Sequence, residues 1–320
     1  MKIPVILLLI IVLSSFNIFA LSQESNIDYK KEMVNFVEKI SQKSKENNPD
    51  FAIFSQNALE LVDYPNYVNS ITGISQESIY YGDKIDGRQT QNSITKYLES
   101  NLYKFKLKNK IILTLDYPFL NKNKPRFDTT TLKKIDKVYK SSLSKGYIPY
   151  TSVRNLNYLT INKNHKPELN KNIKDFSQIK EWVIQLQPAK NQNRTNFLKS
   201  LSNSGFDLIV IDYSFDGTKN TEFSKDEILL LKKNLNGKVI AYISIGEAED
   251  YRWYWKKEFE KNKPLWLDKE NNKWPGNYKV KYWNKEWQEF IFNYIEKIQA
   301  QGFDGVFLDL VDSYEYFENN

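Results

Sequence analysis

Asp309 is the clearest candidate for chemistry in this sequence, because its acidic side chain follows a short apolar run. The run at 306–308 is preceded by Gly-Phe-Asp-Gly at 302–305 and followed directly by Asp309. This pattern predicts a buried parallel strand that delivers a carboxylate to a polar edge. The alternative is that Asp309 only caps a turn or the next helix, as Asp often does after a strand.

The same pattern recurs along the chain, where apolar and β-branched runs end in acidic or amide residues. The runs are 51–57, 71–78, 111–117, 206–213 and 238–246, and the polar residues at or just beyond their ends are Gln56, Asn57, Glu77, Asp116, Asp212, Glu247 and Glu249. In a (β/α)8 barrel the active site is built at the C-terminal ends of the strands, so polar residues repeated at this position predict one shared site.

Acid–base chemistry in this protein is expected from Asp, Glu and Tyr. The chain has no Cys, which excludes a thiolate for zinc binding or nucleophilic attack, a disulfide framework and a lipid-modified cysteine. The single histidine, His165, lies in a polar segment with the composition of a loop, so we expect it to be solvated rather than part of a Ser-His-Asp triad. We therefore expect a carboxylate-based site that needs no metal and no cofactor.

The net charge of +7 and the pI near 9.0 raise the question of an anionic partner. The lysines are spread through Asn- and Ile-rich sequence and form no basic cluster. We interpret the charge as background composition and expect no nucleic-acid partner.

Tryptophan is concentrated in one stretch: of the 7 tryptophans, all except Trp182 lie between Trp253 and Trp287. Such a density fits platforms on which sugar rings stack. Large buried aromatic side chains are the ordinary alternative, and we assign at most two or three of these residues to a substrate.

The N-terminal residues 1–20 have the pattern of a secretory signal peptide, with Lys2 before an apolar run at 3–13 and Ala20 at a suitable cleavage position. An uncleaved anchor is the alternative, although 3–21 is barely long enough to span a bilayer and is interrupted by polar residues. We expect a secreted or extracytoplasmic monomer with no stable membrane span after cleavage.

Alternating strand and helix patterns indicate an α/β protein with a parallel sheet. Helices are predicted at 28–45, 90–109, 129–144, 194–204, 226–235 and 287–301, with a loop at 58–70. Besides the runs named above, short strands are candidates at 147–150, 182–187 and 278–283, which gives one strand too many for a barrel. We expect either 147–150 or 182–187 to be the extra one, and we favour a single (β/α)8 barrel over an open doubly wound sheet.

Four extended motifs give the chain a resemblance to a known family. They are the segments 206–214, 241–252, 274–278 and 302–317, and together they resemble glycoside hydrolase family 114. These are TIM-barrel enzymes typified by endo-α-1,4-polygalactosaminidase.

The order of the matching segments predicts a circular permutation. Residues 28–160 resemble the C-terminal half of the family, residues 161–178 read as a connector, and residues 179–320 resemble the N-terminal half. A barrel tolerates this rearrangement because its first and last strands are neighbours, so we expect Asp28 and Phe317 to lie close together in one structural domain.

The resemblance implies a catalytic Asp and Glu, which fall on Asp309 and Glu77. We assign Asp309 as the nucleophile and Glu77 as the acid/base residue, since glycoside hydrolysis uses such a pair. The predicted substrate-binding residues around them are Asp212, Tyr242, Glu247, Glu249, Arg252, Gln56, Asn57 and Asp116. For these residues a structural ion-pair network around Arg252 is the alternative.

The implied function is a secreted glycoside hydrolase that cleaves an amino-sugar polysaccharide similar to α-1,4-polygalactosamine. The positive charge of the chain opposes binding of a polycation at long range, but salt screens it beyond about 8 Å, and an acidic mouth would reverse it at contact. The alternative function is a non-catalytic secreted carbohydrate-binding protein on the same scaffold.

Overall fold

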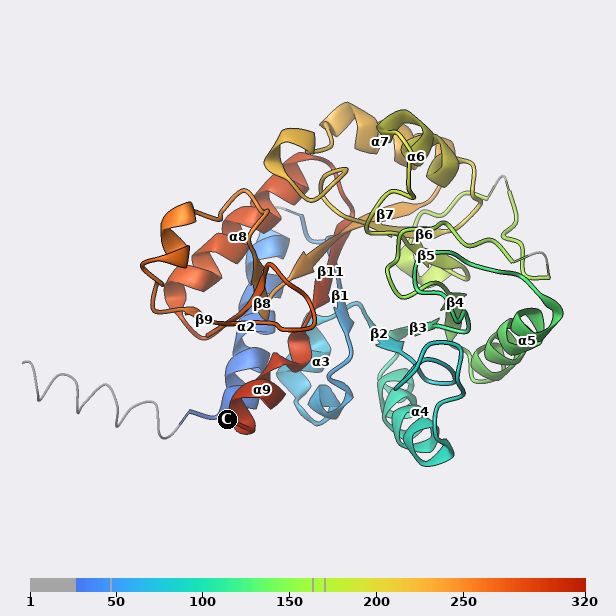
Figure 1. Ribbon diagram of the computed structural model, residues 1–320, viewed down its shortest axis with the longest axis horizontal. Coiled ribbons are helices and arrows are strands. Elements are labelled where there is room, and N and C mark those ends of the chain that lie inside the picture. The colour runs from blue at the N-terminus through green and yellow to red at the C-terminus, as the bar shows by residue number, and fades with distance from the viewer. Residues whose placement is uncertain (1–26, 47, 163, 170) are drawn as a thin grey trace, which may run out of the picture.

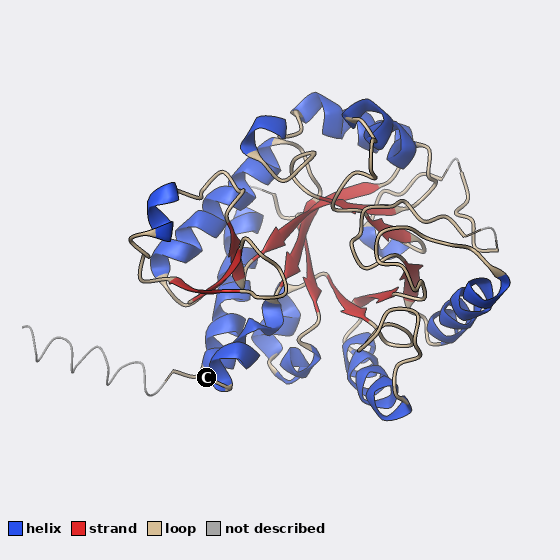
Figure 2. Ribbon diagram, in the orientation of Figure 1, coloured by secondary structure: helices blue, strands red, loops and turns tan. Residues whose placement is uncertain are grey.

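The computed structural model describes residues 27–320 except residues 47, 163 and 170. The predicted signal peptide at 1–20 lies outside the described residues. At the centre is one 8-stranded parallel sheet that curls into a barrel (Figure 2). Its strands are β1 (Ala52–Gln56), β2 (Gly73–Glu77), β3 (Ile111–Asp116), β4 (Ile148–Thr151), β5 (Trp182–Ile184), β6 (Leu208–Ile211), β7 (Lys238–Ser244) and β11 (Gly305–Asp309).

The strands follow one another around the barrel in chain order, and the last strand, β11, pairs in parallel with the first, β1. The remaining seam lies between β4 and β5, which contact each other without forming a ladder. There the indole Nε1 of Trp182 donates a 2.9 Å hydrogen bond to the carbonyl oxygen of Ile148. The (β/α)8 barrel predicted from the sequence is therefore confirmed, with a nearly closed sheet.

Helices surround the sheet (Figure 1). In chain order they are α2 (Tyr29–Glu46), α3 (Pro65–Ser70), α4 (Asn92–Leu107), α5 (Thr129–Ser144), α6 (Arg194–Ser202), α7 (Lys225–Leu235), α8 (Lys285–Ala300) and α9 (Tyr314–Glu318). Some of them start with capping residues: Asp128 caps α5, and Ser224 and Glu227 form a capping box at α7.

The two ends of the described chain meet beside β1 and β11. Helix α2 packs against α8 and α9, and the ring centres of Tyr29 and Phe317 lie 5.5 Å apart. This confirms the expected proximity of residues 28 and 317. Any closed barrel brings its first and last strands together, so the contact is compatible with a circular permutation without demonstrating it, and the permutation remains a prediction.

A smaller antiparallel sheet is inserted between β7 and α8. It contains β8 (Glu247–Glu249), β10 (Asn277–Val280) and β9 (Leu267–Glu270), in that spatial order. The insertion and α8 bury much of the tryptophan-rich stretch: Trp266 and Trp287 are fully buried with ring centres 5.1 Å apart. Among the described tryptophans, Trp274 is the exposed one, at 51%. The crowding of tryptophan thus reflects mainly core packing.

Three details of the sequence interpretation were wrong. Both short candidates at 147–150 and 182–187 are barrel strands, and the extra strand is the one at 278–283, which corresponds to β10 in the insertion. The predicted loop at 58–70 contains a short 3₁₀ helix (Leu59–Asp63) and α3. His165 is not simply solvated, because it stacks on Tyr139 with ring centres 4.1 Å apart and lies 2.9 Å from the Asp136 carboxylate.

The barrel interior is set by the register of its strands. Trp182 on β5 and Phe307 on β11 stack with ring centres 6.2 Å apart although β6 and β7 lie between their strands, so both side chains point inward. Phe54 is the register partner of both Phe307 and Gly73. A Cβ on Gly73 would lie 2.5 Å from the Phe54 ring, so only glycine fits beside this aromatic side chain.

Candidate active site at the carboxyl ends of the strands

Side chains alternate between the two faces of a strand, so the inward face continues from the apolar core to the carboxyl ends. Two residues beyond Phe307 this face carries Asp309, and two beyond Phe54 it carries Gln56. On β2 the same face runs from Gly73 to Glu77, and on β7 it includes Tyr242, the register partner of Phe307. The register therefore brings four of the predicted site residues to one mouth of the barrel.

Asp309 is held at this mouth by two hydrogen-bond donors. The hydroxyl of Tyr242 donates to Oδ2 at 2.7 Å, and the backbone N–H of Leu310 donates to Oδ1 at 2.8 Å. Burial raises the pKa of Asp309 to about 6; the two hydrogen bonds act in the opposite direction, and the negative charges of Glu77 and Glu247 add to the increase. The pKa of Asp309 therefore lies above the ordinary range of an aspartate, at about 6.

Glu77, at the end of β2, is contacted by residues from three other strands or strand ends. Tyr117 donates its hydroxyl to Oε2 at 2.7 Å, Arg154 Nη1 lies 3.4 Å from the same oxygen, and Asn57 Nδ2 lies 3.4 Å from Oε1. The side chain is 31% exposed. Because its charge affects the pKa of Asp309, the two predicted catalytic residues belong to one electrostatic unit.

Gln56 lies on β1, the strand between those of Asp309 and Glu77. The residue is only 6% exposed, yet its side-chain oxygen has no hydrogen-bond partner among the described residues. An unsatisfied buried amide is costly, which favours a partner supplied from outside the chain.

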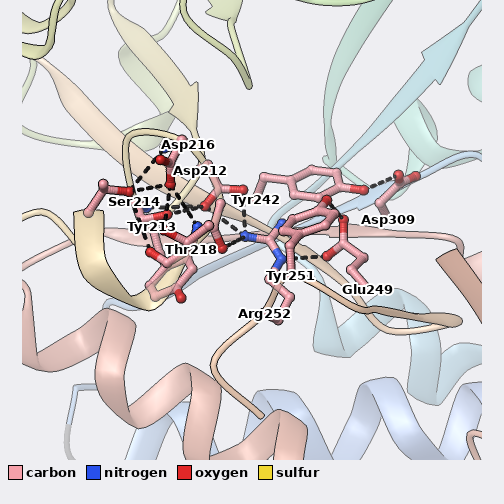
Figure 3. A network of polar contacts seen from close by, with 12 residues as sticks. Asp212, Tyr213, Ser214, Asp216, Thr218, Tyr242, Glu249, Tyr251, Arg252 and Asp309 are labelled. Carbon is pink, nitrogen blue, oxygen red and sulfur yellow. Dashed lines mark hydrogen bonds and ion pairs between the residues drawn. The ribbon is translucent and has the colours of Figure 1, made fainter. Parts of the chain in front are cut away.

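Asp212, Glu249 and Arg252 form a buried ion-pair network (Figure 3). Arg252 Nη1 lies 2.7 Å from Asp212 Oδ2, and its Nε lies 2.6 Å from Glu249 Oε2. Tyr251 donates its hydroxyl to the other oxygen of Glu249. Burial raises the pKa of Asp212, although the charge of Arg252 opposes the shift. The charged groups of Asp212, Glu249 and Arg252 pair with one another. This agrees with the alternative that these residues form a structural ion-pair network.

Two further predicted substrate-binding residues are also engaged internally. Glu247 is 1% exposed and pairs with Lys279 at 2.6 Å across the small sheet. Asp116 is fully buried, and its Oδ1 accepts hydrogen bonds from the backbone N–H groups of Tyr80 and Tyr81, each at 2.7 Å. Burial raises the pKa of Asp116 to about 7. Asp116 therefore anchors the loop between β2 and α4 and offers no exposed oxygen to a sugar.

The sequence interpretation missed three residues at this mouth. Tyr117 and Arg154 contact Glu77 directly, and Arg154 stacks on the Tyr117 ring with its guanidinium carbon 3.6 Å from the ring centre. The third is Asp312, which lies just beyond β11. Burial raises its pKa to about 7, with further increases from the charges of Asp309, Glu315 and Glu77. Asp312 could have been flagged, since it belongs to the same acidic run as Asp309.

Within the described residues, no group of three or more His, Cys, Asp or Glu side chains is arranged to hold a metal ion. In the same part of the chain, no helix combines the length and apolar composition needed to cross a bilayer.

The fold and the site define a (β/α)8-barrel protein with a carboxylate-rich centre on the face where such barrels carry their active sites. The chain belongs to glycoside-hydrolase family GH114, whose model matches residues 162–320. The matched part contains β5 to β11, including Asp309, and leaves out β1 to β4 with Glu77.

Curated relatives are similar over part of the chain. An uncharacterised protein of Methanocaldococcus jannaschii is 54% identical over 140 residues, which cover 43% of this chain and 38% of the relative. An uncharacterised protein of Thermotoga maritima is 44% identical over 142 residues, covering 44% and 42%. The chain thus spans less than half the length of these relatives.

Solved structures with partial similarity include the glycoside hydrolase domain of PelA from Pseudomonas aeruginosa, at 18% identity and a TM-score of 0.30 over 42% of this chain and 45% of that one. Aspergillus fumigatus Ega3 in complex with galactosamine is 23% identical, with a TM-score of 0.31 over 50% and 51%. Similarities at this level do not bear on the function of this chain.

Proposed function

We propose that this protein hydrolyses glycosidic bonds with Asp309 and Glu77 as its pair of catalytic carboxyl groups. The observation that carries the proposal is the placement of both residues on the inward face of the barrel, at the ends of β11 and β2, with β1 alone between their strands. The family assignment supports the reaction class. The electrostatic coupling of the two groups fits a pair that works on one substrate.

The chemistry follows from the two carboxyl groups. Glu77 gives its proton to the glycosidic oxygen while the bond from that oxygen to the anomeric carbon breaks, and an oxygen of ionised Asp309 attacks the anomeric carbon to form an ester. Water then attacks the same carbon, passes its proton to Glu77 and releases Asp309 as a carboxylate. Gln56, with its unsatisfied buried amide oxygen, is placed to accept a hydrogen bond from a sugar hydroxyl or amine.

An amino-sugar polymer fits the charge of the mouth. Asp309, Asp312 and Glu77 gather there, whereas the guanidinium of Arg154 is shared with Asp86. A protonated amino group would be attracted to this surplus of carboxylates at contact distance. The net charge of +7 acts against a polycation mainly at long range, where salt screens it beyond about 8 Å.

We also propose that the protein acts outside the cytoplasm, on the basis of the signal pattern at 1–20. N-terminal sequencing of protein recovered from the medium of a secreting host checks this. A start at residue 21 supports cleavage, and retention of residues 1–20 contradicts it.

The activity is tested by incubating the purified chain with α-1,4-linked polygalactosamine, its N-acetylated form and amylose, followed by mass spectrometry of released oligosaccharides. Release from the polygalactosamine but not from amylose supports the proposal. A preparation of the Asp309→Asn, Glu77→Gln double variant, purified in parallel, shows whether a contaminating hydrolase is responsible.

Affinity electrophoresis in gels containing the same polymers separates catalysis from binding. A wild-type chain that is retarded by a polymer but releases nothing from it would overturn the catalytic proposal in favour of a carbohydrate-binding protein. A chain that neither binds nor cleaves any of the three polymers would overturn the proposed substrate class.

A further inference from the structure

Arg154 occupies a central position beside Glu77. It follows β4 and reaches across the end of β3 to the neighbourhood of β2. Its Nη1 lies 3.4 Å from Glu77 Oε2, and its Nε and Nη2 lie 3.0 and 2.9 Å from Asp86 Oδ1. Its Nη2 also donates to the carbonyl oxygen of Gly82. One guanidinium therefore contacts both the Glu77 carboxylate and the loop at 78–91 that joins β2 to α4.

The contact between the Arg154 guanidinium and the Tyr117 ring holds the two donors to Glu77 Oε2 together. The guanidinium carbon lies 3.6 Å from the centre of the Tyr117 ring, and the Tyr117 hydroxyl donates to the same Glu77 oxygen that faces Arg154. Because the two donors are stacked on each other, neither can rotate away without losing that contact. Glu77 Oε2 is therefore held in one orientation.

The loop at 78–91 also packs against Tyr117. The N–H of Gly87 donates to the Tyr117 carbonyl oxygen at 2.8 Å. Gly82 has a φ of +99°, and a Cβ there would lie 2.7 Å from Tyr117 Cβ, so the loop passes too close for a larger residue. Arg154 adds a second connection, because its contacts with Asp86 and Gly82 join this close-packed loop to the Glu77 carboxylate.

We propose that Arg154 is a positioning residue that orients the Glu77 carboxyl group and fastens the 78–91 loop beside it. The inference rests on the proposed function only for the catalytic use of Glu77. Arg154 and Tyr117 contact Glu77 directly, and the charge of Glu77 raises the pKa of Asp116, Asp309 and Asp312. Among these five groups, Arg154 is the one cation.

The chain offers a matched control in Arg194. Its Nε and Nη2 lie 2.7 and 2.6 Å from the carboxylate of Glu227, and its guanidinium carbon lies 4.8 Å from the ring centre of Phe223. The side chains of Arg154 and Arg194 are similarly exposed, at 24% and 30%. Arg194 thus makes the same kinds of contact at the start of α6, away from Glu77.

The first test measures Glu77 without any substrate. Protein labelled with 13C at the glutamate carboxyl carbon is compared by NMR at one pH, and the Glu77 signal is assigned as the one missing from Glu77→Gln. In Arg154→Gln we expect this signal to move and to broaden, because the carboxyl group loses a charged donor and is no longer held in one orientation. Arg154→Lys should move it less, and Arg194→Gln should leave it unchanged.

The second test measures turnover of α-1,4-polygalactosamine by the same variants at equal folded fraction. We expect kcat to fall at least tenfold in Arg154→Gln with KM changed less than threefold, partial rescue in Arg154→Lys, and little change in Arg194→Gln. A Glu77 carboxyl signal in Arg154→Gln that keeps its wild-type position and width overturns the proposal and leaves Arg154 a loop anchor. If wild type cleaves nothing, the catalytic proposal fails, and the NMR comparison still decides the inference about Arg154.

Discussion

The hydroxyl of Tyr242 donates a 2.7 Å hydrogen bond to Asp309 Oδ2 and so links two neighbouring barrel strands at the mouth. Burial and the charges of Asp309 and Glu249 raise the pKa of Tyr242 well above its usual range, so the phenol keeps its proton. Figure 3 shows Tyr242 between Asp309 and the Arg252 network. Tyr242 thus donates to the predicted nucleophile and also lies close enough to Glu249 for that charge to raise its pKa.

Tyr242→Phe should weaken catalysis by removing this donor. A hydrogen bond to a charged group contributes about 1.5–3 kcal/mol, so kcat/KM at neutral pH should fall about 10- to 150-fold. The bond also lowers the pKa of Asp309, so its loss should move the acid limb of the pH profile to higher pH. Steady-state kinetics between pH 4 and 9 check both effects.

Tyr213→Phe is the matched control for Tyr242→Phe. Tyr213 is fully buried, and its hydroxyl has no hydrogen-bond partner among the described residues. Its removal should leave the pH profile in place. Equal shifts of the acid limb in both variants would mean that the Tyr242 hydroxyl does not act through Asp309.

Most barrel strands could be predicted from the sequence because they are continuous apolar runs, as expected for strands buried on both faces. The short strands were harder. Pro149 indicated an edge strand, and β4 does pair on one side only, with β3, while its other side faces the seam with β5. Because the barrel has a seam, a strand that pairs on one side only can still belong to it. The proline alone does not indicate this.

The site was predictable only in part. Because a strand such as β3 is buried and apolar on both faces, its sequence does not show which residue at its end points into the barrel. The sequence pattern predicts Asp116 as the site residue at the end of β3, but the inward position is that of Tyr117, which contacts Glu77. The pairing of Arg252 with Asp212 joins residues far apart in the chain and depends on tertiary structure alone.

Arg252→Met tests whether the network around Arg252 is structural. The Arg252 side chain is 1% exposed, and its removal would leave Asp212 and Glu249 buried without their cation. Breaking such a pair costs about 3–5 kcal/mol, so the free energy of unfolding in urea should fall by that amount or the chain should fail to accumulate in folded form. Arg126→Met, at a side chain that is 88% exposed, should change stability little. A wild-type stability for Arg252→Met would refute the structural role.

Asp312→Asn should stabilise the protein at neutral pH but not in acid. The folded-state pKa of Asp312 is raised to about 7, against about 3.9 in an unfolded chain, so its favourable contribution is complete below pH 4 and is lost as the pH rises through 7. Because the residue is partly exposed, we expect a gain of only about 1 kcal/mol at pH 7.5. Urea unfolding at pH 4 and pH 7.5 measures it, with the exposed Asp50→Asn as control. Equal gains at both pH values would contradict the linkage.

The wild-type pH profile should assign the roles of the catalytic pair. With Asp309 as the nucleophile, its ionised form is required, so kcat/KM should be retained above pH 6 and lost as the pH falls through about 6, the raised pKa of this group. If kcat/KM instead falls as the pH rises through about 6, Asp309 supplies the proton and Glu77 takes the nucleophilic role.

Asp309→Asn and Glu77→Gln should each abolish most of the activity while preserving fold and binding. Each change keeps the size of the side chain and removes either the ionised group or the transferable proton, and positioned acid–base catalysis alone contributes about 10²- to 10⁴-fold. Cleavage should fall at least 100-fold, with retardation by the polymer in affinity gels kept. Thermal stability should hold or rise, because Asp309 lies among other carboxylates whose charges raise its pKa.

Asp63→Asn and Glu258→Gln, at side chains that are 71% and 67% exposed, make the same chemical changes away from the mouth and should leave the rate unchanged. An Asp309→Asn variant that cleaves at the wild-type rate, at its normal folded fraction, would remove Asp309 from the mechanism.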